Sequence, residues 1–420
     1  MAGLTIAWAL QQREVQVTVL ERSAVAAGSS WGNAGWITPG LAIPLAEPSV
    51  LLQGVRALRD PTAPLHIPLT ADPRLWAFLA RFAAHCTTAT WRRTLAALVP
   101  VNQRVLTAYD RLDATVPPDV RSRPGPILAA FTDPAHAEPL LHELELVRSA
   151  GLHVPVSEVD AQTLHALVPG LASVVSFGLS LQGQRTIDPG RYVSALAGSV
   201  RDQGGVVREG AEVRRLRHGP GGIAVDVLGA TPVLADAVVL ASGAWMPELA
   251  KGYGVRVPLQ AGRGYSFTVG AEGAPGGAAA AGDGTGEIQV PVYFPRQRVV
   301  ASPLADGLRI GGTMEFRPSD APLDPARIEA IVAAARPLLA GIDLDHRRQQ
   351  WVGARPVTVD GLPLVGATAA PGVYVHGGHG MWGMCQGPAT AELLAEQIVT
   401  GSVPSELAPM DPLRSLRARR

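Results

Sequence analysis

Glycine and acidic residues near the start of the chain have the spacing of a nucleotide-binding turn. Gly3 precedes apolar residues that recur with helical spacing, and residues 15–20 then alternate as a β-branched strand that ends at Glu21. In a Gly-x-Gly-x-x-Gly turn the third glycine packs a helix against a strand, and an acid about 20 residues later binds ribose hydroxyls. Gly3 and Glu21 are 18 residues apart. The pattern therefore predicts the second half of a dinucleotide-binding β-α-β unit.

The first strand and the first two glycines of such a unit would come before Met1. The chain as written therefore lacks the first strand of the expected sheet. We predict that the true start lies about ten residues upstream, with a strand and a Gly-x-Gly turn.

Further glycine-rich blocks follow along the chain. Residues 28–40 contain four glycines among small polar residues, which lets backbone N–H groups approach a flat or phosphorylated ligand. The later blocks are residues 238–245, 263–266, 353–366 and 377–383. Pro388 is suited to the first turn of a helix and Gly401 to its C-terminal cap, so we expect a helix over residues 388–400.

The composition excludes several classes of protein. Lys and Arg number 36 and Asp and Glu number 36, so the net charge is zero and the electrostatic signature of a nucleic-acid-binding protein is absent. With 47% hydrophobic residues the chain is globular rather than disordered. The two cysteines, Cys86 and Cys385, predict neither a disulfide framework nor a thiolate metal site, and the ten histidines lack metal-ligand spacing. We expect no membrane-spanning helix and no signal peptide.

In this order and spacing the blocks resemble the D-amino-acid oxidase superfamily of FAD-dependent oxidoreductases, from Gly3 to about Gly401. Within it they are most similar to the bacterial D-amino-acid dehydrogenases. The resemblance implies an α/β fold, with an FAD-binding Rossmann-like domain of the glutathione-reductase type and an α+β substrate domain with an antiparallel sheet. We expect the FAD-binding domain to comprise residues 1–50, 155–250 and 350–405, the substrate domain residues 51–154 and 251–349, and a basic tail residues 406–420.

The resemblance implies non-covalent FAD as the cofactor. Glu21 would accept hydrogen bonds from the ribose hydroxyls, and the N-terminus of the final helix would face the flavin and stabilise negative charge on it. Cys385 is expected to be an inert buried thiol. The residues implied to bind the cofactor are Gly3, Glu21, Arg22, Ser29, Ser30, Asn33, Ala34, Gly35, Val213, Ser242, Gly243, Trp245, Gly378, His379, Gly380 and Gly383.

Three residues are implied to act on the substrate: Arg355, Tyr265 and His379. A buried carboxylate favours a bidentate guanidinium, and the family places such an arginine where Arg355 stands. The alternatives left open are a salt bridge of Arg355 within a sheet, a core position for Tyr265, and a solvated loop position for His379. Some family members have an arginine where this chain has Met381, which argues against a glycine-oxidase type of enzyme.

The implied reaction is oxidation of a D-amino acid to a 2-oxo acid and ammonia, by hydride transfer from the substrate Cα to flavin N5. Electrons would pass to a quinone or another acceptor. One alternative is a secondary-amine dehydrogenase or oxidase acting on a hydroxyproline- or sarcosine-like substrate, and another is a non-catalytic relative. We expect a cytoplasmic enzyme. The arginines of the tail (Arg414, Arg417, Arg419 and Arg420) are expected to lie in solvent, or to contact anionic lipid on the inner face of the membrane.

Overall fold

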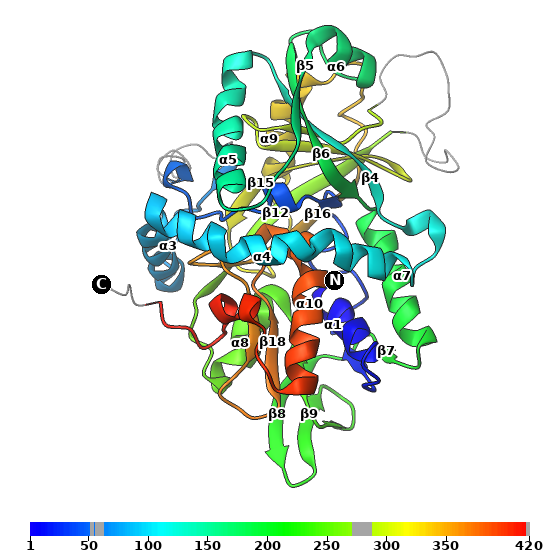
Figure 1. Cartoon of the computed structure of the whole chain (residues 1–420), viewed down its shortest axis with the longest axis vertical. Helices are drawn as coiled ribbons and strands as arrows, with labels where there is room; N and C mark the ends of the chain where they lie inside the picture. The colour runs from blue at the N-terminus through cyan, green and yellow to red at the C-terminus, as the bar shows by residue number, and fades with distance from the viewer. Residues whose placement is uncertain (51–53, 55–62, 271–287, 417–420) are drawn as a thin grey trace.

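The computed structural model describes residues 1–50, 54, 63–270 and 288–416 (Figure 1). Its helices are α1 (Ala2–Gln11), α3 (Pro73–His85), α4 (Thr88–Asp113), α5 (Glu138–Ser149), α6 (Ala161–Leu167), α7 (Pro189–Asp202), α8 (Met246–Ala250), α9 (Pro325–Ala335) and α10 (Gly383–Thr400). Its strands are β1 (Thr18–Leu20), β2 (Trp36–Ile37), β3 (Leu65–His66), β4 (Arg123–Phe131), β5 (Val156–Asp160), β6 (Phe177–Thr186), β7 (Val206–Arg208), β8 (Val213–Gly219), β9 (Gly222–Val227), β10 (Val233–Ala235), β11 (Val238–Leu240), β12 (Leu259–Val269), β13 (Val292–Phe294), β14 (Val299–Leu304), β15 (Gly307–Phe316), β16 (Arg348–Thr358), β17 (Leu364–Ala367) and β18 (Val373–Gly377).

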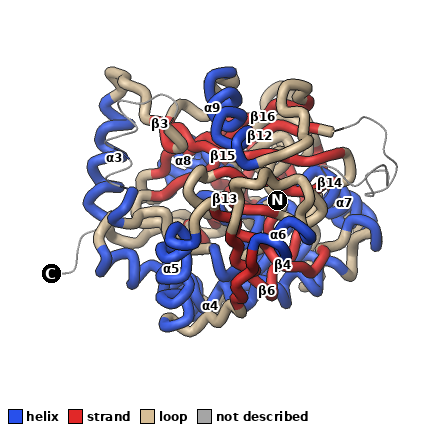
Figure 2. Tube along the Cα trace, turned by 90° about the horizontal axis from the view of Figure 1, so that it is seen from above, coloured by secondary structure: helices blue, strands red, loops and turns tan. Residues whose placement is uncertain are grey.

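The largest sheet lies in the upper half of Figure 1 and is mainly antiparallel. Its order is β16-β12-β15-β14-β13-β4-β6-β2, with β3 paired to β15 and β5 paired to β6. Helix α9 packs on β12, β14 and β15, and Figure 2 shows this arrangement from above. Apolar side chains such as Phe267, Phe294 and Ile331 are fully buried between the helix and the sheet. Burial of this apolar area holds the long strands in place.

A second region contains three small sheets and the helices beside them, and one of these sheets is antiparallel in the order β10-β9-β8. β1 pairs in parallel with β7, and β11 pairs in parallel with β18. Helix α1 contacts α7 and α10, and all three contribute to one apolar cluster. The helix followed by a strand and an acid, predicted from residues 3–21, is therefore present, with a shorter strand than the predicted residues 15–20. The α/β class is confirmed.

β1 and β11 each lie at one edge of a small sheet. Within the described residues, β1 pairs only with β7 and β11 pairs only with β18. Residues of both strands line the same cleft. The additional first strand that the sequence led us to expect is in neither sheet, and it stays a prediction.

Helix α10 begins earlier than the sequence predicted, at Gly383 rather than at Pro388. A proline inside a helix leaves one carbonyl without its N–H partner. Here that carbonyl belongs to Met384, and it accepts a 2.6 Å hydrogen bond from the hydroxyl of Tyr109 on α4. A tertiary contact thus replaces the missing helical bond. The predicted cap at Gly401 is confirmed, with φ of 76°.

Membership of the large sheet does not follow the segments that the sequence analysis assigned to the two domains. Strands β2, β6 and β16 belong to the large sheet, although the sequence placed all or most of their residues in the cofactor-binding segments. Residues 417–420 of the predicted tail lie outside the described residues. The prediction that Arg414 lies in solvent is wrong. Its side chain is 11% exposed, and its Nε atom lies 2.8 Å from a carboxylate oxygen of Asp360.

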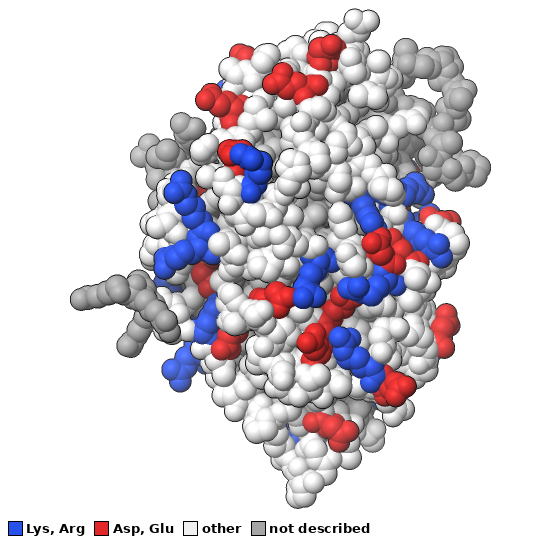
Figure 3. Space-filling view, viewed as in Figure 1, with Lys and Arg blue, Asp and Glu red and all other residues white. Residues whose placement is uncertain are grey.

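The surface carries interspersed charges. Acidic and basic side chains alternate over the face shown in Figure 3, as the balanced composition suggests. In the part of the chain that the structure describes, no helix has the length and apolar character needed to cross a membrane.

Candidate functional site

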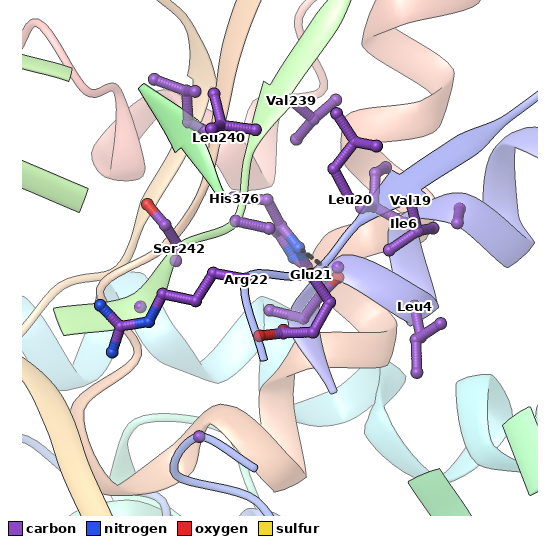
Figure 4. Close-up of a pocket in the computed structure, with 18 of the residues that line it drawn as sticks. Leu4, Ile6, Val19, Leu20, Glu21, Arg22, Val239, Leu240, Ser242 and His376 are labelled. Atoms are coloured by element: carbon purple, nitrogen blue, oxygen red, sulfur yellow. Dashed lines mark hydrogen bonds between the residues drawn. The ribbon is translucent and has the colours of Figure 1, made fainter. Parts of the chain in front are cut away.

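A cleft of about 880 Å³ is lined by residues of the three small sheets and of the large one (Figure 4). It is lined by β1 and the loop after it, by the segment from β11 to Trp245, by Arg355 on β16, and by the turn that leads into α10. Its volume lies in the upper part of the range for small-molecule and cofactor sites. The walls combine apolar side chains of β1 and β11 with polar groups at and after the ends of these strands. This composition is typical of a site that orients a ligand by a few directed contacts.

Most residues that the sequence singled out line this cleft. They are Gly3, Glu21, Arg22, Ser29, Ser30, Asn33, Val213, Ser242, Gly243, Trp245, Arg355, His379, Gly380 and Gly383. Four others are not among its lining residues: Ala34, Gly35, Gly378 and Tyr265. Sequence reasoning missed His376 and Met384, which also line it. In the sequence, His376 is marked only as a polar residue within an apolar strand, and Met384 only as the neighbour of the last glycine block.

Charged and aromatic groups lie at the end of the cleft near β1. The Glu21 carboxylate accepts a 3.1 Å hydrogen bond from the backbone N–H of Ser23. The guanidinium of Arg22 lies 4.1 Å from the centre of the Trp245 ring, a cation–π contact. The carboxylate of Asp320 contacts both side chains. It lies 3.2 Å from Nη2 of Arg22 and accepts a 2.9 Å hydrogen bond from Nε1 of Trp245. Two elements far apart in sequence therefore meet at this end of the cleft.

The glycine-rich loop after β1 is anchored to the large sheet. Ser266 on β12 donates a 2.8 Å hydrogen bond to the carbonyl of Gly32, and Ser29 donates to the carbonyl of Ala354. Gly32 must be a glycine, because an added Cβ would lie 2.1 Å from the Trp351 ring. These contacts fix the loop along one wall of the cleft, as a ligand-binding loop requires.

Arg355 is placed by strand register. It lies opposite Gly262 on β12, and an added Cβ at Gly264 would lie 2.0 Å from its Nη2 atom. Burial lowers the pKa of Arg355 to about 10, and no described acid offsets this effect. The cleft therefore contains a partly buried cation that pairs with no described acid, which favours binding of a ligand carboxylate or phosphate.

Tyr265 lies elsewhere. It is 1% exposed and packs in the apolar cluster of the large sheet, where its hydroxyl donates to the carboxylate of Glu315. Arg263 is paired with the same carboxylate at 3.0 Å. Burial, followed by the hydrogen bond to Glu315, raises the pKa of Tyr265 above its usual value. The structure therefore does not bring Tyr265 and Arg355 together.

Two buried histidines lie side by side in the wall of the cleft. Nε2 of His376 and Nε2 of His379 each lie 2.9 Å from Oγ1 of Thr390 on α10. Burial lowers the pKa of His376 to about 4, and burial together with His376 lowers the pKa of His379 well below its usual value. Both rings are therefore neutral at pH 7.

Cys385 follows Met384 in the first turn of α10, beside the cleft. Burial raises the pKa of Cys385 to about 12, so this thiol is unreactive at neutral pH. Within the described residues, no three His, Cys, Asp or Glu side chains lie close enough to hold a metal ion.

Comparison with known proteins now gives the family. The family model described as DAO, FAD dependent oxidoreductase, matches residues 1–397. This chain belongs to that family. A D-amino acid dehydrogenase of Cereibacter sphaeroides is 31% identical over 411 residues, covering 96% of this chain and 91% of that protein. One of Methylobacterium radiotolerans is 31% identical over 420 residues, covering 98% and 96%.

Solved structures agree with the fold. Glycine oxidase from Geobacillus kaustophilus superposes with a TM-score of 0.69 at 20% identity, covering 99% of this chain and 96% of that one. L-proline dehydrogenase from P. horikoshii superposes with a TM-score of 0.67 at 18% identity, covering 98% and 94%. At these identities the likeness concerns the fold alone.

As a member of this family, the protein is an FAD-dependent oxidoreductase. The cleft described above suits FAD as the cofactor. Ser242 Oγ is buried there without a hydrogen-bond partner among the described residues. Gly243 and Gly380 have φ of 57° and 54°, and an added Cβ at either would meet no described atom within 4 Å. Open backbone and an unpaired hydroxyl along a long cleft fit an extended nucleotide.

Proposed function

We propose that the protein oxidises the Cα–N bond of D-amino acids, giving 2-oxo acids and ammonia after water hydrolyses the imine. The observation that carries this proposal is the unpaired guanidinium of Arg355 at the cleft. It is supported by the two relatives named D-amino acid dehydrogenase, each 31% identical over nearly the whole chain. The cleft and the relatives together favour a carboxylate-bearing amine as substrate.

FAD, when bound, supplies the two-electron acceptor for the Cα hydrogen and its electron pair. We propose that Glu21 binds the ribose of FAD, that Ser242 and the loop of Ser29 and Ser30 bind its middle part, and that the turn at Gly380 borders its ring. All of these residues line the cleft. The N-terminal turn of α10 adds partial positive charge at this end.

Arg355 would bind the substrate carboxylate through two parallel hydrogen bonds and so hold the Cα in one orientation. The amine loses its proton to solvent before oxidation, since no described carboxylate stands beside Arg355 to act as a base. The neutral histidines leave the positive charge of Arg355 as the feature that attracts an anion. We further propose that electrons pass on to a quinone or a comparable acceptor, because the relatives are named dehydrogenases.

Anaerobic spectroscopy of the FAD-reconstituted protein tests the proposal. D-alanine and other D-amino acids should bleach the visible flavin absorption and yield one 2-oxo acid and one ammonia per flavin reduced, whereas L-alanine should not. Bleaching by sarcosine or proline derivatives alone would instead establish the secondary-amine reaction. Failure to retain any FAD would support a non-catalytic relative.

A further inference from the structure

We propose that a directed hydrogen-bond chain, from His379 through Thr390 to His376, presents the bare Nδ1 of His379 to the cleft as an acceptor for a ligand N–H. Thr390 is then a positioning residue, which acts through His379. The inference deepens the proposed function, on which its second half rests. Its first half, the position of the proton on His379, depends only on hydrogen bonds within the protein.

The contact of His376 with Ala2, at the far end of the hydrogen-bond chain, sets the direction of the hydrogen bonds. Nδ1 of His376 lies 3.1 Å from the carbonyl oxygen of Ala2, in the first turn of α1. A carbonyl can only accept, so Nδ1 of His376 must carry the proton. Because the ring is neutral, its Nε2 has no proton and must accept a hydrogen bond. The partner at 2.9 Å is the hydroxyl of Thr390, which therefore donates to His376.

The near end follows from the single proton of that hydroxyl. Thr390 Oγ1 has given its proton to His376, so it can only accept from His379, whose Nε2 lies 2.9 Å away. Nε2 of His379 therefore carries the proton. Its ring is neutral as well, because burial and the neighbouring His376 ring, 5.2 Å away, disfavour a cation. Nδ1 of His379 is thus a bare lone pair.

The reverse arrangement is unfavourable. Were Thr390 to donate to His379, His376 would need its proton on Nε2, and its Nδ1 lone pair would face the lone pairs of Ala2. A buried acceptor left opposite another acceptor is strongly unfavourable, because neither lone pair gains a hydrogen bond in place of the one it loses to water. The carbonyls of Gln386 and Gly387 lie 3.0 Å and 3.1 Å from Thr390 Oγ1 and compete with His376 for the hydroxyl proton. If the hydroxyl donates to either carbonyl, it still can only accept from His379, so Nε2 of His379 carries the proton in that case too.

The open end of the chain lies where a ligand binds. His379 lines the cleft, and the turn that follows it, Gly380–Trp382, lies beside β16, the strand of Arg355. The cleft thus offers the guanidinium of Arg355 to an acid group of a ligand, and Nδ1 of His379 as an acceptor for an N–H group. Both the flavin ring and an amino acid carry N–H donors. The shared chemistry is an N–H group, and the experiment distinguishes the two sources.

Nitrogen NMR of protein labelled with ¹⁵N-histidine tests the chain. Long-range ¹H–¹⁵N correlations separate protonated from bare ring nitrogens, and His379→Gln and His376→Gln assign the two rings. We expect a bare Nδ1 and a protonated Nε2 for His379. Thr390→Ser should keep this pattern, and Thr390→Val should lose it. Thr400→Val is the control and should change neither ring, because the exposed hydroxyl of Thr400 bonds only to nearby backbone groups, the carbonyl of Glu396 and the N–H of Ser402. A proton on Nδ1 of His379 in the parent protein would overturn the proposal.

Ligand additions identify the donor. If FAD alone shifts the Nδ1 resonance, the N–H belongs to the cofactor. If 2-aminobenzoate shifts it and benzoate does not, the N–H belongs to the substrate, and Thr390→Val should weaken 2-aminobenzoate binding by about tenfold. If no addition moves the resonance, Nδ1 is not a ligand acceptor and this half of the proposal is wrong. All these readings remain valid if no D-amino acid is oxidised, so the two failures are distinguishable.

Discussion

Replacing Arg355 with methionine should weaken ligand binding and at the same time stabilise the fold. Methionine has a similar length but carries no charge. Hydrogen bonds between a guanidinium and a carboxylate contribute about 2–3 kcal/mol, so the dissociation constant of benzoate should rise by about 30- to 150-fold. Benzoate titration of the FAD-bound protein, followed by the flavin spectrum, measures this change.

The expected gain in stability follows from the pKa. Burial lowers the pKa of Arg355 to about 10, so the folded state binds this proton more weakly than the unfolded state does. Below pH 10 the charged group therefore destabilises the fold, and that penalty is lost as the pH rises through the folded pKa. The depression corresponds to about 3 kcal/mol at most, and we expect a gain of about 1–3 kcal/mol at pH 7, because the side chain borders the open cleft. Urea unfolding without ligand measures it.

Two further variants sharpen this test. Gly264→Ala keeps the charge but puts a Cβ where Nη2 of Arg355 now lies, so it should weaken benzoate binding by moving the guanidinium. Arg92→Met, at an exposed position on α4, is the control and should change neither quantity. Unchanged benzoate binding by Arg355→Met, or a loss of stability in that variant, would refute the reasoning.

Three other predictions follow from single contacts. Glu21→Ala should raise the dissociation constant of FAD by about tenfold, measured by fluorescence titration; an unchanged constant would exclude Glu21 from the ribose site. Burial, followed by the nearby Glu47, raises the pKa of Glu143 to about 7, so its folded form holds the proton more tightly and stability falls between about pH 4.5 and pH 7. Glu143→Gln should remove that decline in urea midpoints, and a persisting slope would contradict it. Arg414→Met strands the carboxylate of Asp360, which is 10% exposed, and should cost about 3 kcal/mol in urea unfolding; an unchanged midpoint would show that the pair contributes nothing.

Features set by neighbouring residues could be predicted from the sequence. The helix and strand leading to Glu21 follow from the periodicity of the chain, and the cap at Gly401 follows from the freedom of glycine to adopt positive φ. The start of α10 could not be predicted in the same way. It depends on Tyr109, a residue of another helix whose hydroxyl satisfies the carbonyl that Pro388 leaves free.

Membership of the large sheet is a second property that local patterns do not contain. β2 contributes two residues and pairs with β6, more than a hundred positions later in the chain. β16 joins the same sheet through β12. Strand pairing across such distances is decided by packing and register, which one sequence does not reveal. The polar network around Thr390 is of this kind too, since it joins α10, β18, the following loop and the first turn of α1.

The placement of Tyr265 shows why a motif gives a position but not a direction. Side chains alternate between the two faces of a strand, so Tyr265 and Gly264 point to opposite sides of β12. The side of Gly264 holds the guanidinium of Arg355, and Ser266, two residues on, reaches the carbonyl of Gly32 on the same side. The opposite side holds Glu315 and the apolar cluster under α9. Because one residue of register separates these two environments, Tyr265 could share the face of Arg355 only if β12 slipped by one position, and that slip would bury Ser266 in the apolar cluster without its partner.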